Sequence, residues 1–144
     1  MPGTAIGPNS PSPVRLGVVG VICRQDRLLV IRRSALVTAP RAFCFPGGGI
    51  EAGESEPQAL IRELHEELGV AATPLRKIWS SITPWNVALS WWRATIADTA
   101  LLQPQAAEVE SCHWHTVAEM AANPDLLDSN RRFLQALHRG EFTL

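Results

Sequence analysis

The stretch from Gly48 to Val70 reads GGIEAGESEPQALIRELHEELGV and decides the fold of this 144-residue chain. Ser55 and Gln58 have the spacing of a capping box, in which each side chain satisfies the other residue's backbone amide. Glu56-Pro57 suits the first turn of a helix, and Gly69 suits the position just past its last residue. The sequence therefore predicts a helix between these two ends.

Three glutamates share one side of this predicted helix. At about 100° per residue, Glu63, Glu66 and Glu67 fall within an arc of about 100°. The expected apolar stripe lies beside this arc and consists of Leu60, Ile61, Leu64 and Leu68. We therefore expect the carboxylates at the rim of the core, on a rigid element.

The segment 48–70 holds six of the ten glutamates of the chain, with Arg62 as its only Lys or Arg, and carries a formal charge of −5. Composition alone favours a solvated acidic helix face over a cation site. Carboxylates three and four residues apart repel one another, and a divalent cation would reverse this repulsion. Hard oxygen ligands suit Mg²⁺ or Mn²⁺, whereas Zn²⁺ would call for His or Cys. His65 projects away from the arc and is expected at the surface.

The spacing of these residues matches a known pattern. From Gly48 through Glu54 and Arg62 to Val70, all nine defined positions fit G-x5-E-x7-R-E-U-x-E-E-x-G-U, with U aliphatic. This resembles the Nudix box, and Phe45-Pro46-Gly47 before it suits the same family. The resemblance extends more loosely from Val14 to about Glu119.

The resemblance implies a hydrolase that depends on Mg²⁺, with Mn²⁺ as a possible substitute, and that cleaves a pyrophosphate linkage in a small nucleotide. It implies these metal ligands: Glu63, Glu66, Glu67 and the backbone of Gly48. By the same resemblance, Arg62 pairs with and orients a carboxylate, and Glu54 supports the site.

A further acidic residue of the family often stands six residues before a tryptophan. Glu108 stands six before Trp114, which makes it a candidate for a further metal ligand or for the general base. Glu110 is the second choice for this role. Which glutamate acts as the base stays open, because one of the three box glutamates could also serve.

The substrate is less well determined. Of the four tryptophans between residues 79 and 92, two or three are expected in the core, and Trp85, after Pro84 in an expected loop, is the candidate to stack on a base. Small size favours a MutT-like pyrophosphohydrolase of (deoxy)nucleoside triphosphates. Pro84 lies 14 residues past the box, which keeps an ADP-ribose or nucleotide-sugar pyrophosphatase as the alternative. A non-catalytic, nucleotide-sensing domain would typically lack box carboxylates, and none is missing here.

The rest of the chain indicates one domain. Residues 1–13 are rich in Pro and Gly and are predicted to be a disordered tail, followed by a Nudix domain over 14–144. We expect an α+β fold in which a mixed sheet lies between helices, as α/β/α layers. Strands are expected at 14–23, 28–31, 43–45, 77–83, 87–97 and 110–115, later helices at 117–121 and 130–139, and a flexible loop at 47–49.

Composition excludes several classes of function. A net charge of −1 gives no electrostatic basis for binding a nucleic-acid polymer or an anionic membrane. The longest apolar run, at 16–23, has eight residues and is too short to span a bilayer. No secretory signal is evident, and three widely spaced cysteines make no disulfide framework. We therefore expect a cytoplasmic monomer or homodimer.

Overall fold

The computed structural model describes residues 14–144, so the tail predicted over 1–13 lies outside the described residues. Seven strands and three helices follow one another along this part of the chain. They are β1 (Arg15–Arg24), β2 (Arg27–Arg33), β3 (Phe43–Cys44), β4 (Gly47–Gly49), α1 (Glu56–Leu68), β5 (Thr73–Ile82), β6 (Val87–Thr95), β7 (Val109–His115), α2 (Val117–Ala122) and α3 (Asp128–His138).

The strands form a mixed sheet in the order β3-β2-β1-β6-β5, with β4 also paired to β1 and β7 also paired to β2. β1 runs parallel to β6, and the other pairs are antiparallel. β1 and β2 are joined by a tight turn at Gln25, where φ is 58°, and they pair only near this turn. The earlier part of β1 is thus free to pair with β4, which carries the glycines that precede the box glutamates.

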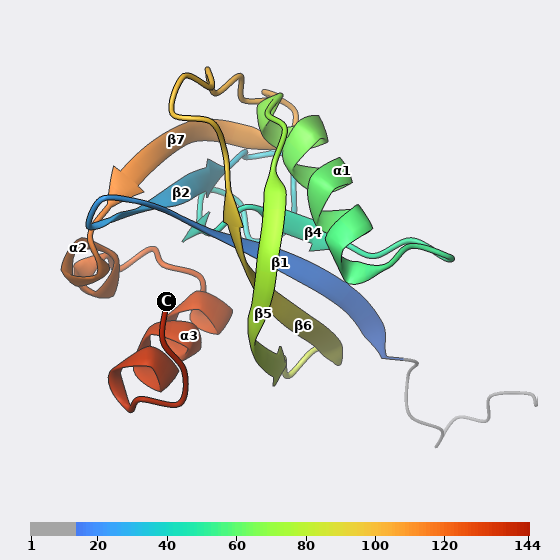
Figure 1. The fold of residues 1–144 in the computed structure, drawn as a ribbon. Coiled ribbons are helices and arrows are strands. Elements are labelled where there is room, and N and C mark those ends of the chain that lie inside the picture. Colours follow the sequence, from blue (N-terminus) through green and yellow to red (C-terminus); the bar gives the residue numbers. More distant parts are fainter. Residues whose placement is uncertain (1–13) are drawn as a thin grey trace, which may run out of the picture.

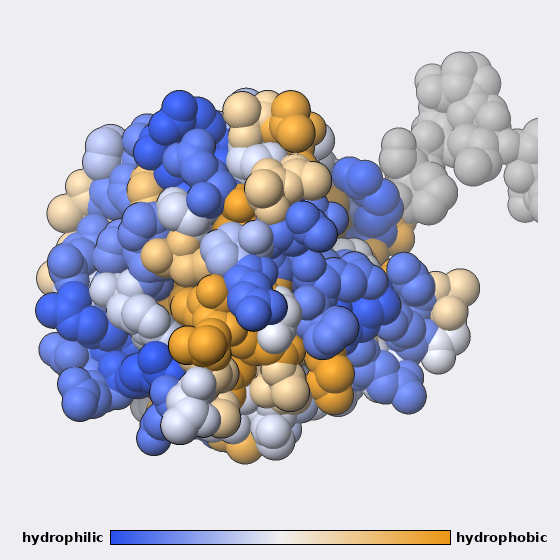
Figure 2. Space-filling view, turned by 90° about the horizontal axis from the view of Figure 1, so that it is seen from above, coloured by the Kyte–Doolittle hydropathy of each residue, from blue (hydrophilic) through white to orange (hydrophobic). Residues whose placement is uncertain are grey.

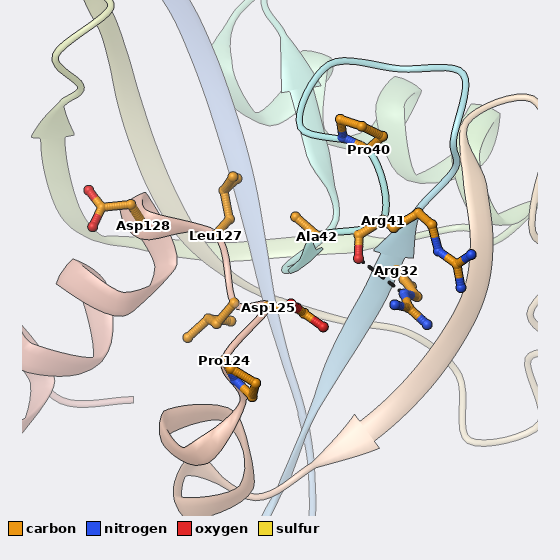
Figure 3. Close-up of a pocket in the computed structure, with 9 residues that line it drawn as sticks. Arg32, Pro40, Arg41, Ala42, Pro124, Asp125, Leu127 and Asp128 are labelled. Atoms are coloured by element: carbon orange, nitrogen blue, oxygen red, sulfur yellow. Dashed lines mark hydrogen bonds between the residues drawn. The ribbon is translucent and has the colours of Figure 1, made fainter.

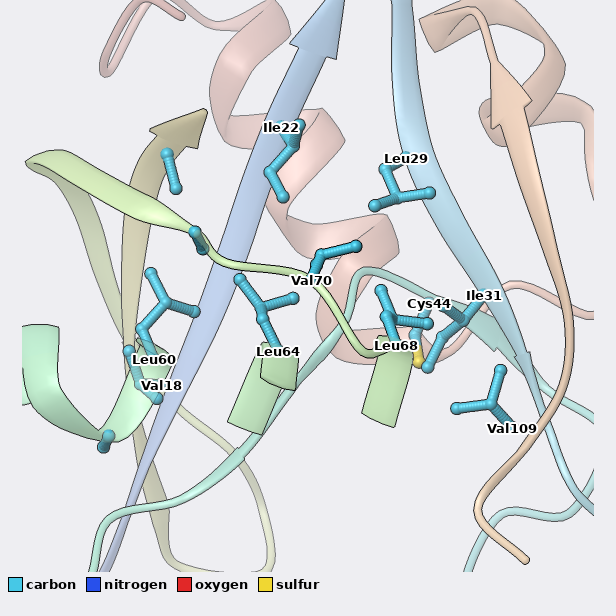
Figure 4. Close-up of a cluster of buried hydrophobic side chains, with 13 residues drawn as sticks. Val18, Ile22, Leu29, Ile31, Cys44, Leu60, Leu64, Leu68, Val70 and Val109 are labelled. Carbon is cyan, nitrogen blue, oxygen red and sulfur yellow. The ribbon is translucent and has the colours of Figure 1, made fainter. Parts of the chain in front are cut away.

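Each face of the sheet carries its own apolar core because side chains alternate along a strand. Val18 and Ile22 of β1 pack toward α1, in the cluster shown in Figure 4, whereas Val19 and Val21 pack toward α3. On the α3 side, Trp91 stacks on Phe133 with ring centroids 4.7 Å apart. In Figure 1, α1 accordingly lies on one side of the sheet and α2 with α3 on the other. The predicted α+β sandwich is confirmed.

Two expectations about the region around α1 were wrong. The segment Gly47–Gly49 is a short strand rather than a flexible loop, since it pairs in register with residues 17–19 of β1. Glycine runs carry no apolar alternation, so the sequence pattern held no signal for this pairing. Ile61 is 44% exposed and lies outside the buried stripe, which Ala59 completes instead.

Polar residues cover most of the face shown in Figure 2, with a smaller apolar area near its centre. Of the helices in the part of the chain described here, none combines the length and the apolar character needed to cross a membrane. The three cysteines are free thiols, and Cys44 alone among them is buried.

Candidate active site

Both ends of α1 are capped by the residues predicted for this role from the sequence. The Gln58 backbone N–H donates to Ser55 Oγ at 3.2 Å, and the Ser55 N–H donates to Gln58 Oε1 at 2.9 Å. Gly69 adopts the left-handed conformation with φ 65°, and its N–H donates to the His65 carbonyl. The caps set where the helix begins and ends. The buried leucines Leu60, Leu64 and Leu68 set its rotation against the sheet, and this rotation determines where its glutamates lie.

The glycine strand β4 packs closely against the acidic side of α1. The Gly47 N–H donates to Glu67 Oε1 at 3.0 Å. A Cβ at position 48 would overlap the carboxylate of Glu63, so only glycine fits there without displacing that group. The backbone of β4 is therefore in direct reach of two of the three predicted metal ligands.

Arg62 is the cation at the centre of the acidic cluster. Its Nε and Nη2 donate to the two carboxylate oxygens of Glu54 at 2.7 and 2.8 Å. Its Nη1 donates to Glu63 at 2.9 Å and to Glu66 at 3.3 Å. The hydrogen bonds from Arg62 are the main cause that lowers the pKa of Glu54 to about 2. Arg62 thus pairs with carboxylates of the box, whereas its orienting role stays a prediction.

Glu67 is the most buried of the three box glutamates, at 6% exposure. Burial raises the pKa of its carboxyl to about 8, and the neighbouring charge of Glu63 adds to this effect. Burial also raises the pKa of Glu63, although hydrogen bonds from Arg62 oppose the change. The fold therefore holds carboxylates in a place where their charge is poorly compensated.

Glu108 lies next to the same cluster although it is 41 residues away from Glu67 in sequence. The loop before β7 is tied to the end of α1, because the Gln105 N–H donates to the Glu67 carbonyl at 2.8 Å. The charge of Glu108 adds to the rise in the pKa of both Glu63 and Glu67, after burial in each case. Glu110, the second choice, instead pairs with arginines outside this cluster.

The donor set suits a hard divalent cation, because four mutually repelling carboxylates would gain attraction from it. In the present arrangement, no three His, Cys, Asp or Glu side chains of residues 14–144 converge as metal ligands. In this arrangement Arg62 Nη1 pairs with both Glu63 and Glu66. Metal ligation by these glutamates therefore stays a prediction.

A cleft of about 820 Å³ opens beside β4. Its lining includes all three glycines of β4 and, farther along the chain, Trp85, which is 75% exposed. The other three candidate tryptophans are packed into the protein: Trp91 lies in the core under α3, Trp79 packs against that core, and Trp92 packs against the core under α1. Trp85 is thus the one of the four whose ring is available at the cleft.

A smaller hollow of about 370 Å³ lies between the 34–42 loop and the connection from α2 to α3 (Figure 3). Arg32 and Arg41 line it, and Arg32 Nε donates to the Arg41 carbonyl at 3.0 Å. Both arginines are paired with Glu110, at 3.7 and 3.5 Å. The two arginines thus share one carboxylate, and none of the predicted site residues lines this hollow.

The sequence interpretation missed Arg33, which lines the large cleft next to the glycine strand. Nothing in the box pattern marks it, because it ends β2, fifteen residues before the box begins at Gly48. A polar residue at the end of a buried strand was the available signal.

Comparison with known proteins agrees with this geometry. The chain is 43% identical over 56 residues to the CTP pyrophosphohydrolase of Escherichia coli strain K12, covering 39% of this chain and 42% of the relative. It is 42% identical over 53 residues to the 8-oxo-dGTP diphosphatase of the same strain, covering 36% and 41%. With the NAD-capped RNA hydrolase NudC of Deinococcus radiodurans it shares 33% over 98 residues, covering 67% and 34%.

These alignments span about two-fifths or less of the length of each relative. A crystal structure of a MutT NUDIX hydrolase from Burkholderia pseudomallei shares the fold with a TM-score of 0.71 at 24% identity, covering 86% of this chain and 98% of the other. The model of the NUDIX domain matches residues 13–137, which include every site residue named above. The chain belongs to the NUDIX domain family.

Proposed function

We propose that the protein is a Mg²⁺-dependent hydrolase that cleaves a pyrophosphate linkage in a small nucleotide. One observation carries this proposal: a glycine strand with accessible backbone lines a large cleft and also contacts two glutamates of α1, Glu63 and Glu67, whose pKa values are raised mainly by burial. A polyphosphate can approach such a cluster only with cations in between. The family membership and the names of the curated relatives support the same chemistry.

Each residue has a distinct task in this proposal. Glu63, Glu66 and Glu67 would hold Mg²⁺, with the backbone of Gly48 and the carboxylate of Glu108 as further ligands. Bound there, the ion would neutralise phosphate oxygens and promote formation of a nucleophile from water. Either Glu108 or one of the box glutamates would accept the proton of the attacking water.

Arg62 is proposed as the residue that orients the ligand carboxylates. Glu54 fixes two of its N–H groups, which leaves Nη1 directed at Glu63 and Glu66. A guanidinium held in this way is rigid, and it compensates the repulsion of the glutamates before a metal binds.

For the substrate we propose a (deoxy)nucleoside triphosphate, with Trp85 stacking on its base at the cleft. Two relatives are named for CTP and 8-oxo-dGTP, which favours triphosphates over ADP-ribose or a nucleotide sugar. The relatives named for NAD-capped RNA share a longer but less similar stretch with this chain. We further propose that the protein acts in the cytoplasm on free nucleotides.

The test is a turnover screen with Mg²⁺ and purified protein, with nucleotide products separated and identified by chromatography and released pyrophosphate and phosphate measured separately. The panel holds the eight common (deoxy)nucleoside triphosphates, 8-oxo-dGTP, ADP-ribose, a nucleotide sugar and an NAD-capped RNA. We expect pyrophosphate release from one or more triphosphates. Turnover confined to ADP-ribose or the nucleotide sugar would favour the alternative, and no turnover with any member would contradict the proposal.

A further inference from the structure

Arg33 ends β2 at a point where the pairing with β7 shifts register between Arg32 and Arg33. Such a bulge redirects the side chains on either side of it. The two neighbouring arginines accordingly meet different surroundings. Arg32 lies over the Phe43 ring and pairs with Glu110, whereas Arg33 lines the large cleft beside β4.

The guanidinium of Arg33 is held in place from one side. Its Nε donates to the Thr38 carbonyl at 2.8 Å, and its Nη2 donates to Thr38 Oγ1 at 3.2 Å. It also lies near the buried thiol of Cys44: burial raises the pKa of that thiol to about 11, and Arg33 opposes the rise. Since a guanidinium has five N–H donors, these contacts leave donors for a ligand in the cleft.

The charge of Arg33 is also available. Within residues 14–144, Arg33 forms no direct ion pair, whereas Arg62 pairs with four glutamates. Arg33 still lies close enough to Glu67 that its charge opposes the rise in the pKa of Glu67 caused mainly by burial. The guanidinium therefore lies near the acidic cluster without forming an ion pair with any of its carboxylates.

The side chains that line the cleft carry a net positive charge, which favours binding of an anion. Three arginines line it, at positions 15, 33 and 132, against one carboxylate, that of Asp128. Asp128 in turn pairs with Arg132 at 2.9 Å. Of these three arginines, Arg33 is the one that lies near both the glycine strand and Glu67.

We propose that Arg33 is a phosphate-binding residue of this site, whose guanidinium, oriented by Thr38, donates to the phosphate chain of the substrate next to Glu67. This inference rests on the proposed function, because it assumes that a pyrophosphate group lies over β4. The substrate phosphates would then contact two positive groups: the Arg33 guanidinium on the cleft side and the metal ion expected on the glutamate side. A bidentate guanidinium suits phosphate oxygens in both charge and geometry.

The test compares two affinities in the same variants. Imidodiphosphate, a pyrophosphate analogue that resists hydrolysis, is titrated by calorimetry at saturating Mg²⁺, and Mn²⁺ alone is titrated without any phosphate. Arg33→Gln should weaken imidodiphosphate binding at least about tenfold, the loss expected for one charge-assisted hydrogen bond. The same variant should bind Mn²⁺ as tightly as the wild type or more tightly, because a nearby positive charge has been removed.

Arg32→Gln is the matched control, since it removes the adjacent arginine from outside the cleft, and it should leave both affinities unchanged. Arg33→Lys should show an intermediate loss, because it keeps the charge but not the planar fork. Should Arg33→Gln fail to fold, Thr38→Ala removes one restraint on the guanidinium and should weaken imidodiphosphate binding alone.

Unchanged imidodiphosphate affinity in a folded Arg33→Gln protein would overturn the inference, and so would a parallel loss of both affinities, which indicates general damage to the site. If the wild type hydrolyses nucleotides and binds imidodiphosphate, such a result leaves the proposed function standing. A wild type that does neither would contradict the proposed function and this inference together.

Discussion

Arg62 and Glu54 form a two-pronged ion pair, with Nε and Nη2 of the arginine donating to separate carboxylate oxygens at 2.7 and 2.8 Å. This pair fixes the plane of the guanidinium, and the remaining Nη1 therefore points at Glu63 and Glu66. The arrangement couples the loop before α1 to the acidic side of the helix. Disturbing Glu54 should consequently be felt at residues that it does not itself contact.

Glu54→Gln tests this coupling. The amide cannot accept both arginine donors, so Arg62 should lose its orientation and turnover should fall about 10- to 100-fold, as for outer residues that position metal ligands. The matched control is Glu51→Gln, since Glu51 lies 3.7 Å from Arg62 and its side chain is 67% exposed. Steady-state kinetics of both variants measure the effect. Equal turnover in Glu54→Gln and Glu51→Gln would show that the Arg62–Glu54 ion pair contributes no more to the site than an exposed surface pair.

The pKa of Glu67 predicts a pH dependence of stability in metal-free protein. A carboxyl in the unfolded chain releases its proton near pH 4.5, whereas Glu67 in the folded protein holds it to about pH 8. The unfolded state therefore binds fewer protons between these values, and the Glu67 contribution to the free energy of unfolding should fall as pH rises from about 4.5 through about 8.

Thermal melts in EDTA between pH 5 and 9 measure this effect. The wild type should lose more of its melting temperature over this range than Glu67→Gln, whose amide does not titrate and can still accept from the Gly47 N–H. Parallel curves of melting temperature against pH for the two proteins would mean that burial does not raise the pKa of Glu67.

The ends of α1 make separate contributions to stability. Ser55→Ala removes the acceptor of the Gln58 N–H and should cost about 1 kcal/mol of the free energy of unfolding. Gly69→Val should cost more, because φ at Gly69 is 65° and a Cβ there would lie 3.1 Å from Gln103 Oε1. Urea denaturation provides both values, and a neutral Gly69→Val would show that α1 does not end in this conformation.

Adjacent glycines of β4 should respond differently to the same substitution. In Gly48→Ala the new methyl group overlaps the Glu63 carboxylate, so that carboxylate must move and turnover should fall at least about tenfold. In Gly49→Ala the nearest atom is the Leu16 carbonyl oxygen at 4.0 Å, so turnover should change less than twofold. Equal effects in the two variants would mean that close contact with Glu63 is not what requires glycine.

Sequence reasoning predicted the elements whose signals are local. The capping box and Gly69 set both ends of α1, and the arc of glutamates followed from helical geometry. Trp85 was separated from the packed tryptophans by its place after a proline in an expected loop. These predictions succeeded because neighbouring residues alone determine them.

Features that depend on distant pairing were not accessible in the same way. The strand conformation of β4 exists only through its register with β1, and a glycine run leaves no pattern for it. The exposure of Ile61 depends on which side of the helix the sheet covers, and that also brings Glu67 into the buried arc. Arg33 lines the cleft at a register shift between β2 and β7, which no periodicity in the sequence marks.

The central claim is that Glu66 and Glu67 serve chemistry rather than folding, and its most direct test is a paired measurement of turnover at saturating Mg²⁺ and melting temperature in Glu66→Gln and Glu67→Gln. Glu66→Gln removes a like charge, and Glu67→Gln replaces a buried carboxyl whose pKa is raised to about 8 by an amide of similar shape, so we expect the melting temperature to fall by less than about 4 °C or to rise. Each also removes a ligand charge, so we expect turnover to fall at least about a hundredfold. Wild-type turnover in both variants, or loss of turnover only together with a collapsed melting temperature, would contradict this account.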